Sequence, residues 1–574
     1  MSALPGQDAP SGYLRYLPPV LWEHEQSAEP GEFTLGGALR IFERILTGVP
    51  DGVGVSGGTG VPDGVGASEG SGVPHGDHTH PPLTEQIAGL PDLFDPWHTP
   101  ERFLPWLASW VALDFPALGG KQLWDEYQRR KVTAEISRIH RLRGRRTGLD
   151  TYLNLYAVGR VRPRVALDDG TRVMTLAPAP TGTGPVTALV TQGPTLGAGG
   201  QPWNEGVMRP TCVAVGPDGS LFLGDAGTPD DATAVLPSRV WRLNSAGHYE
   251  TAGAPPKPVP VAATTLPLGR AVAVAVRPAR DGAPETLYVA DRSGKLYAVE
   301  APYTGRSAVL VGQLAPAGTA VWPVAMCVDG NGDLLVLDRG VGPPSTAAPK
   351  VITVRTAPFS AVPTRLRTVL EPLSLLVEPD GSLVIGDGGN QRPALDAPLA
   401  GNLVRVGRAA ADWTETALLP SGNPLLAPTA LCPGPDGRLG YVLDVGLKPL
   451  FPPSGGAFTL KAAEPAVVHR VRLDAGTPEL TPLTDPGCFV YPTGMARAEG
   501  RLVVCDHGQP DGSGQPTHLA RLRPHRLDVV VHFAESRLPQ DAPSRTRVRN
   551  QALGVIRALV DQHKPAHVLS VLVK

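Results

Sequence analysis

The densest group of potential metal ligands is His75-Gly-Asp-His-Thr-His80, with three histidines and one aspartate within six residues. Imidazole and carboxylate groups are good zinc ligands, but a structural zinc site needs a rigid frame and usually a second half-site. The flanking sequence is rich in glycine and offers neither. We therefore expect no native metal site and no cofactor; if a metal binds, the candidate ligands are His75, Asp77, His78 and His80.

Three short glycine motifs lie in the same stretch of the chain. Residues 52–57 satisfy G-x-G-x-x-G, and residues 54–58 and 66–70 satisfy G-x-S-x-G. A dinucleotide-binding turn and a nucleophile elbow both need a preceding strand and a following helix. The surrounding sequence predicts neither, so we interpret these matches as accidents of composition.

An aspartate recurs at the end of an apolar run in six places, at intervals of 47 to 66 residues. Calcium binding or catalysis would use carboxylates, but a group that recurs once per repeat at an equivalent place indicates a structural role. We expect these side chains to cap turn amides between strands. The six residues are Asp225, Asp291, Asp338, Asp387, Asp444 and Asp506.

Each of these aspartates belongs to a repeated pattern of an apolar strand, a turn with glycine and a second strand ending in Asp. A third strand follows, the last one expected at 519–523. Four-stranded units at this spacing close radially into a β-propeller, which leaves few open edges. The repeats resemble NHL-type propeller blades. We expect about six blades, and leave open a seventh, irregular blade within 165–210.

Propeller enzymes usually carry their site at the axis, where the innermost strands begin. The pattern places those positions at 210–212, 269–271, 322–324, 373–375, 428–430 and 492–494, which contain one arginine and no His, Asp or Glu. An acid–base or metal cluster would lack its groups there. The sequence therefore predicts that the chain is not an enzyme.

The composition excludes several classes of protein. The chain has 574 residues, of which 18% are charged and 42% hydrophobic, and its formal net charge is −2. This small net charge argues against electrostatic attraction of the whole chain to nucleic acid or to an anionic membrane. Five cysteines are too few for a disulfide framework. We find no signal peptide and no apolar run long enough to span a membrane.

The ends of the chain differ from its middle. Residues 12–47 and 83–165 have helical periodicity, interrupted by a low-complexity, glycine-rich loop at 48–82. Residues 526–574 predict a strand, an amphipathic helix and a strand, which need a partner strand; residues 160–167 are the natural candidate. We expect a multidomain chain: a helical, α+β domain formed by 1–165 and 526–574, with an all-β propeller inserted at 166–525.

Five stretches near the two ends of the chain stand out: YLPPVLWEHE (16–25), LRIFERIL (39–46), LPDLFDPWHTPERFLPWLASWVALDF (90–115), RRKVTAEISRIHRLRGRRTGLDTYLNLY (129–156) and KPAHVLSVLV (564–573). In these stretches the chain resembles the phage tail protein I family of tail baseplates and contractile injection systems. The glycine-rich loop and the propeller depart from the family pattern. The resemblance implies a wedge component that joins the sheath-proximal baseplate to the central hub without catalysis.

Aromatic and basic residues of this part are candidates for contacts with other subunits. Tryptophans beside short helices either anchor a subunit interface or fill a small core, and the sequence does not decide between the two. The stretch 121–146 holds nine Lys or Arg against three Asp or Glu; without interleaved aromatics it predicts a solvated or protein-facing helix rather than a nucleic-acid site. The interface candidates are Phe94, Trp97, Phe103, Trp106, Trp110, Arg129, Arg130, Arg145 and Arg146.

Together these patterns predict a structural baseplate component of a contractile injection system, present in many copies and in contact with wedge, hub or sheath-proximal subunits. The propeller would project and bind a protein or a surface ligand; the alternative is a hydrolase, lyase or glycan-binding effector domain. The expected place of assembly is the cytoplasm, with release of the particle left open. No nucleic-acid partner is expected.

Overall fold

A computed structural model describes Leu35, Leu39 and residues 87–573, with gaps in the second range. The gaps are 116, 119–120, 123, 157–160, 162, 191–205, 228–237, 253–256, 262–269, 304–305, 317, 320, 343–344, 347, 390–400, 409–412, 451–458, 463, 474–477, 509–525 and 535–536. Leu35 and Leu39 are helical; the loop 48–82 and the histidine and glycine motifs lie outside the described residues. The chain forms two compact units, Met1–Phe115 with Arg129–Ala134, and Pro116–Gln128 with Glu135–Lys574.

The described helices of the first unit are short. They are α4 (Leu90–Phe94), the 3-10 helix η3 (Glu101–Phe103) and α5 (Leu104–Trp110). Proline in the first turn of α4 and of α5 fits its fixed φ and missing N–H. The longer helix α6 (Glu126–Arg141) supplies residues 129–134 to this unit.

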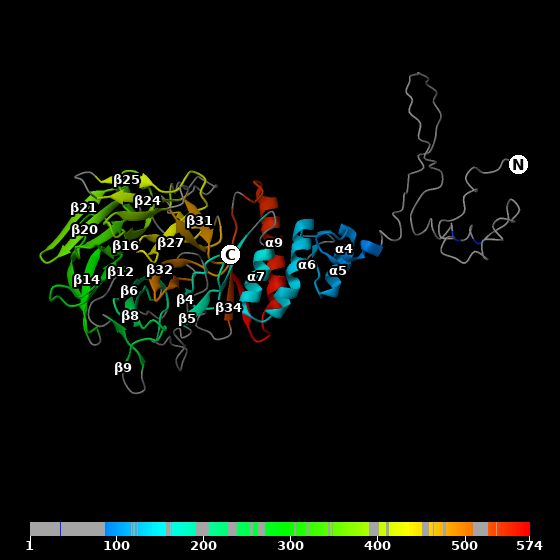
Figure 1. Cartoon of the computed structure of the whole chain (residues 1–574), viewed down its shortest axis with the longest axis horizontal. Helices are drawn as coiled ribbons and strands as arrows, with labels where there is room; N and C mark the ends of the chain where they lie inside the picture. Colours follow the sequence, from blue (N-terminus) through cyan, green and yellow to red (C-terminus); the bar gives the residue numbers. More distant parts are fainter. Residues whose placement is uncertain are drawn as a thin grey trace, which may run out of the picture. The chain divides into compact units, whose positions relative to one another are not determined.

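The repeat region forms six four-stranded antiparallel sheets among the described residues (Figure 1). Their inner strands contact one another in a closed ring, so the region is a six-bladed β-propeller. Counted from the inner strand outward, blade 1 has β6 (Pro210–Val215), β7 (Leu221–Asp225), β8 (Arg239–Leu243) and β11 (Pro260–Val261), and blade 2 has β12 (Ala271–Arg277), β13 (Thr286–Asp291), β14 (Lys295–Glu300) and β15 (Val309–Gln313). Blade 3 has β16 (Pro323–Val328), β17 (Leu334–Asp338), β20 (Lys350–Thr356) and β21 (Phe359–Arg365), and blade 4 has β22 (Pro372–Val377), β23 (Leu383–Asp387), β24 (Asn402–Gly407) and β25 (Thr414–Ala417). Blade 5 has β26 (Pro428–Pro433), β27 (Leu439–Asp444), β30 (Val467–Arg472) and β31 (Glu479–Pro482), and blade 6 has β32 (Pro492–Ala498), β33 (Arg501–Asp506), β4 (Val173–Leu176) and β5 (Thr187–Val190).

Blade 6 is built from both ends of the propeller sequence. Its inner strands β32 and β33 come last in the repeat region, whereas β4 and β5 come before the first blade. Leu502 pairs with Leu176 and Cys505 with Val173 across this closure. Residues 173–190 are therefore the outer half of blade 6 and not a seventh blade, and the third strand expected at 519–523 lies outside the described residues.

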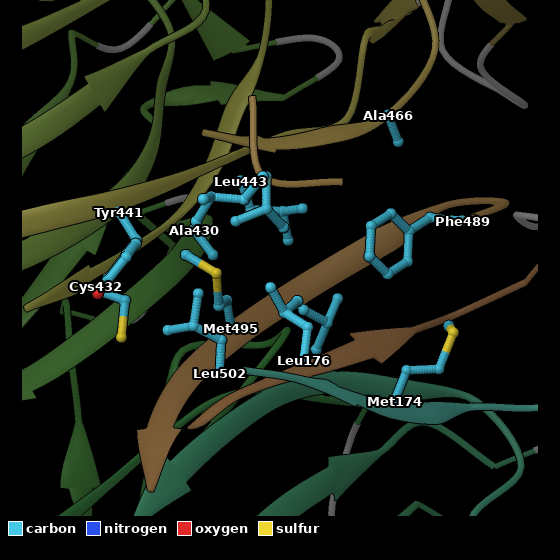
Figure 2. Close-up of a cluster of buried hydrophobic side chains, with 13 residues drawn as sticks. Met174, Leu176, Ala430, Cys432, Tyr441, Leu443, Ala466, Phe489, Met495 and Leu502 are labelled. Carbon is cyan, nitrogen blue, oxygen red and sulfur yellow. The ribbon is translucent and has the colours of Figure 1, made fainter. Parts of the chain in front are cut away.

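A separate apolar cluster fills the space between each pair of neighbouring blades. Figure 2 shows the one between blades 5 and 6, where Met174 and Leu176 of β4 pack with Leu443 of β27 and Leu502 of β33. Because β4 contributes to this cluster, closing the ring buries apolar surface on both sides of blade 6. The closure thus adds hydrophobic stabilisation as well as hydrogen bonds.

The two ends of the second unit form a smaller mixed sheet of β3 (Arg164–Asp168), β34 (Arg526–His532) and β35 (Leu569–Val573). β3 pairs antiparallel with β34, and β34 pairs parallel with β35 through the crossover helix α9 (Ala542–His563). Helix α7 (Arg146–Tyr156) contacts both β3 and α9. The strand predicted at 160–167 is thus the partner of the C-terminal strands.

This sheet packs on the propeller, which explains why both belong to one compact unit. Ala166, Val530 and Val573 of the sheet share an apolar cluster with Val490, which precedes blade 6. The unit boundary therefore does not follow the predicted boundary at residue 165.

Four two-stranded ladders complete the described strands: β1 (Ala117–Leu118) with β2 (Lys121–Gln122), β9 (Thr251–Ala252) with β10 (Lys257–Pro258), β18 (Val341–Gly342) with β19 (Ser345–Thr346), and β28 (Leu447–Leu450) with β29 (Thr459–Ala462). No helix in the described ranges has both the length and the apolar character needed to cross a membrane.

Candidate functional site

Large aromatic side chains gather on the exposed side of α4 and α5. Phe94 is 50% exposed, Trp106 42% and Trp110 61%. Their rings touch: the centroids of Trp106 and Trp110 lie 4.5 Å apart, and that of Phe94 lies 5.5 Å from Trp110. Phe103 meets the Trp106 ring edge-on at 6.2 Å. We call Phe94, Phe103, Trp106 and Trp110 the aromatic surface.

The sequence of α5 explains why these indoles face outward. Leu104, Leu107 and Ala108 are buried and occupy one side of the helix, whereas Trp106 and Trp110, four residues apart, share the other. Apolar residues therefore cover both sides of a seven-residue helix that has only one side to bury. Exposed apolar groups that adjoin one another mark interaction sites more often than isolated ones do.

The predicted basic residues Arg129 and Arg130 brace the loop that carries this surface. Arg130 donates hydrogen bonds to the carbonyls of Pro96 and Thr99, at 2.7 and 2.8 Å. Arg129 forms an ion pair with Glu101. Trp97, in the same loop, is 45% exposed. These two arginines therefore hold the backbone between α4 and α5 in place.

The other interface candidates have different surroundings. Arg145 is exposed, whereas Arg146 pairs with Asp169 at 2.8 Å and donates to the carbonyls of Leu167 and Cys488. Arg146 thus joins α7 to the propeller inside the chain.

Trp124 is a further tryptophan for which the sequence leaves core and interface open. It is 2% exposed and meets Tyr152 edge-on, so it belongs to the core.

The blade aspartates accept hydrogen bonds from backbone N–H groups at one end of the propeller. Asp444, for example, accepts from Leu426, Ala427 and Gly446 at 2.7, 2.9 and 2.8 Å. Asp225, Asp387 and Asp506 each repeat this set of three, and Asp338 accepts from Trp322 and Gly340. In these five blades a glycine with φ between 63° and 74° follows two residues later. The carboxylate ties the entry of the inner strand to the exit of the second strand.

Asp291 is the exception. It accepts from the backbone of Ser293 and Lys295 and from the Ser293 hydroxyl, all within four residues. Blade 2 connects its second and third strands by a tight turn, so the carboxylate closes this turn instead. Among the described residues, no three His, Cys, Asp or Glu side chains gather in a way that could hold a metal.

The propeller axis is more polar than the sequence suggested. In every blade the inner strand has a register shift directly after its first residue. Two residues from each blade then meet at the entrance, one directly before the inner strand and one directly after the blade aspartate, joined by a backbone hydrogen bond. We call these twelve residues the axial mouth: Arg209, Ala226, Arg270, Arg292, Trp322, Arg339, Glu371, Gly388, Ala427, Val445, Tyr491 and His507.

Four ionisable groups of the axial mouth are buried and lie in contact as two pairs. Arg209 is 2% exposed, and its Nη2 lies 2.8 Å from Nε2 of His507. Arg339 forms an ion pair with Glu371, both buried. The expected axial positions include Arg270 and Trp322, but in the other four blades they begin one or two residues too late, and they leave out the residue after each blade aspartate.

Residues 78–166 match the model of a family described as phage tail protein (Tail_P2_I). This stretch resembles a phage tail protein, and we call it the tail-protein segment. The tail-protein segment contains the whole aromatic surface, with the arginines that brace it. The match supports a structural role in a tail and suggests assembly with other tail subunits. A comparison with curated proteins gave no match.

Several solved structures resemble the chain. A periplasmic gluconolactonase from Pseudomonas aeruginosa is 15% identical, with a TM-score of 0.33, over 55% of this chain and 97% of its own. A gluconolactonase from Xanthomonas campestris is 12% identical, with a TM-score of 0.34, over 60% and 94%. A virginiamycin B lyase from Staphylococcus aureus is 12% identical, with a TM-score of 0.31, over 52% and 94%. The strand order and the closed ring of inner strands, rather than these scores, establish the propeller.

The expectation that the chain is not an enzyme is contradicted, since these similar structures are gluconolactonases and a lyase. We do not retain it. The physical reason given for it also fails, because it rested on axial positions without His or Glu, whereas the axial mouth contains His507, Glu371 and four arginines. At such low TM-scores, however, the likeness assigns no activity to this propeller.

Proposed function

We propose that this protein is a wedge component of the baseplate of a contractile, phage-tail-like injection system. The observation that carries the proposal is the exposed aromatic surface within the tail-protein segment. Three large rings that are 42–61% exposed and touch one another leave apolar area in water, and a partner would remove that area. Buried aromatic anchors of this kind supply most of the energy of many protein interfaces.

The occupant of the aromatic surface, in this proposal, is a neighbouring baseplate subunit. Arg129 and Arg130 hold the loop between α4 and α5 before the partner arrives, which lowers the entropy that docking costs. Arg145, exposed at the start of α7, is a further candidate for contact with an acidic neighbour. Assembly would take place in the cytoplasm, and the particle would hold many copies of the chain.

The proposal keeps a tail-protein domain of residues 1–165 and 526–574, with the propeller at 166–525 as a module that binds a protein or a surface. The sheet of β3, β34 and β35 supports this division, because it brings the two ends of the domain together. Arg164 of β3 donates to the carbonyls of Val445 and Val490, both at 2.8 Å, and so anchors the propeller to the sheet.

A second candidate function is ligand binding or hydrolase- or lyase-type chemistry by the propeller. It is favoured by the charged axial mouth, which places an imidazole and a carboxylate among arginines. Screens of the purified chain on esters and glycans would reveal such an activity, and inactivity on all of them would argue against it.

A deletion strain tests the wedge role. Without this chain we expect no complete particles in electron micrographs of lysates, and we expect the wild-type gene supplied in trans to restore them. Antibodies against the chain should decorate the baseplate end of purified particles. Normal particles from the deletion strain would refute the wedge role.

A further inference from the structure

The exposed apolar side chains of the propeller gather on the outer strands of blades 2 and 3. Among the described residues of the propeller, the large apolar side chains that are exposed are Val309, Leu310, Phe359, Val362 and Leu370. The first two lie on β15 of blade 2, where Val309 is 65% and Leu310 49% exposed, and the next two lie on β21 of blade 3. The outer strands of the other four blades carry none.

The strands β15 and β21 contact each other although they belong to different blades. The Phe359 ring of β21 packs on Gly312 of β15, in the space that a Cβ of residue 312 would take. The exposed apolar residues of the two strands therefore form one area on the rim of the propeller.

β15 is also the outer strand least protected against pairing with another strand. Sheets protect an edge with proline, charge, a short strand or a covering segment. The outer strands of blades 1, 3, 4 and 5 contain a proline or a glutamate: Pro260, Pro363, Glu415 and Pro482. β5 of blade 6 contains neither, but its Leu189 packs against Gly247. β15, with the sequence VLVGQ, has no such protection beyond a register shift against β14.

One edge of β15 is unpaired. β15 is the last strand of its sheet, so the backbone groups on the side away from β14 have no ladder partner among the described residues. The charged side chains of β14 and of the turn before β15 lie at the ends of β15, Lys295 opposite Gln313, and Glu300 and Arg306 at the other end. A segment that pairs with β15 must therefore be an extended strand with an apolar centre.

The same strand of a second copy meets this requirement. Two identical strands related by a twofold axis run antiparallel, as β14 and β15 already do. At such an axis the side chains face those of the same strand, and like charges there would be destabilising. β15 carries no charge, and a second copy would cover Val309 and Leu310. The antiparallel direction also brings the Lys295 end of one copy to the Glu300 end of the other.

We propose that two copies of this chain pair edge to edge through β15, so that their two blade 2 sheets become one continuous antiparallel sheet. A strand of five residues forms a smaller interface than stable dimers have, so we expect a dissociation constant on the order of 50 µM. The interface lies on the propeller and uses no residue of the aromatic surface. The proposal therefore does not depend on the wedge role, and docking in the tail does not depend on this dimer.

Sedimentation equilibrium of the purified full-length chain tests the proposal. We expect the average mass to rise from that of one copy toward that of two as the concentration increases from about 5 to about 300 µM. A mass that stays at one copy over this range would overturn the proposal.

Matched variants locate the interface. Leu310→Lys should raise the dissociation constant about tenfold or more, because two copies would bring two ammonium groups to one edge, and Val309→Lys on the same strand should act alike. Leu370→Lys is the control: it makes the same exchange at a 55% exposed position outside the outer strands. Circular dichroism should match the wild type in all three. An equal loss in the control, or none in the β15 variants, would refute the assignment.

A further variant separates this interface from the aromatic surface. With both Trp106→Ser and Trp110→Ser, the chain should dimerise like the wild type, since neither indole lies on the propeller. Loss of the dimer in this variant would assign self-association to the aromatic surface and overturn the role of β15, while leaving the wedge role to its own test.

Discussion

The indoles of blade 1 and of α5 differ in what surrounds them. Trp241 is fully buried, donates from Nε1 to Asp225 at 3.0 Å and meets Tyr249 edge-on. Trp106 and Trp110 are exposed and touch mainly other exposed rings. The propeller blade completes its own interior, whereas the α4–α5 segment leaves its largest side chains uncovered. We infer that the propeller fills its interior without a partner, whereas the tail-protein segment needs a partner to cover its exposed indoles.

The largest expected effect tests whether the propeller depends on its carboxylates. Asp444→Asn should lower the free energy of unfolding by about 4 kcal/mol, because three buried N–H groups lose a charged acceptor. Asp291→Asn should cost only about 2 kcal/mol, since two backbone N–H groups rather than three lose the charged acceptor. Urea denaturation of the two variants measures the difference, and equal losses would contradict this account of the blades.

A smaller loss of folding stability is expected from a substitution at Arg164, where the sheet of β3 contacts the propeller. Burial lowers the pKa of Arg164 to about 10, yet the side chain satisfies two buried carbonyls. Arg164→Met should cost about 2 kcal/mol in urea denaturation, because both carbonyls lose their donor. Arg143→Met is the control, since exposed Arg143 donates to the carbonyl of Gln562 at 2.9 Å and to no other carbonyl of the described residues. If both variants lose the same stability, Arg164 does not anchor the propeller.

Stability should also depend on pH through His563. Burial, followed by the charges of His140 and Arg143, lowers the pKa of His563 to about 4. The unfolded chain takes up this proton near pH 6.5 and the folded chain only near pH 4, so folding loses stability as pH falls between these values. We expect a loss of about 3 kcal/mol at pH 4 from this group.

His563→Phe keeps a ring beside Tyr152 and should flatten that part of the pH profile. His248→Phe, at an exposed position, should leave the profile unchanged. Chemical denaturation at pH 7, 5.5 and 4 provides the comparison. A profile of His563→Phe that matches the wild type would exclude this histidine as the cause.

The sequence predicts the blades well because each repeats the same local chemistry. The second strand ends in Asp, and in five blades Gly with positive φ follows two residues later, so every repeat signals the same turn. The partner strand of the C-terminal segment was also predictable, since an unpaired β-α-β unit needs one.

Closure of the ring was not predictable in the same way. The strands β4 and β5 carry no terminal aspartate and pair with β33 more than 320 residues later in the sequence. The axial mouth was predicted only in part: Arg270 and Trp322 lie at expected positions, but the windows of the other four blades begin too late, and each inner strand has a register shift after its first residue. An extra residue there moves the preceding side chain to the entrance, and no pattern of hydrophobicity marks such a bulge.

Whether tryptophans are core or interface is also beyond the sequence. Trp110 and Trp124 both lie at apolar positions of predicted helices, yet one is 61% and the other 2% exposed. The difference arises because α5 has only seven residues and only one of its sides is buried. Leu104, Leu107 and Ala108 already occupy that side. Only the packing of neighbouring elements decides which indole is covered.

The most direct test of the docking role is the incorporation of a variant with both Trp106→Ser and Trp110→Ser into particles, measured by its amount in purified particles from a complemented deletion strain. We expect stability within about 1 kcal/mol of the wild type, since both side chains are exposed, and at least a tenfold loss of incorporation. Val309→Ser with Val362→Ser, at equally exposed apolar positions of the propeller, should incorporate normally. Full incorporation of the tryptophan variant would contradict the claim that the aromatic surface docks this chain in the tail.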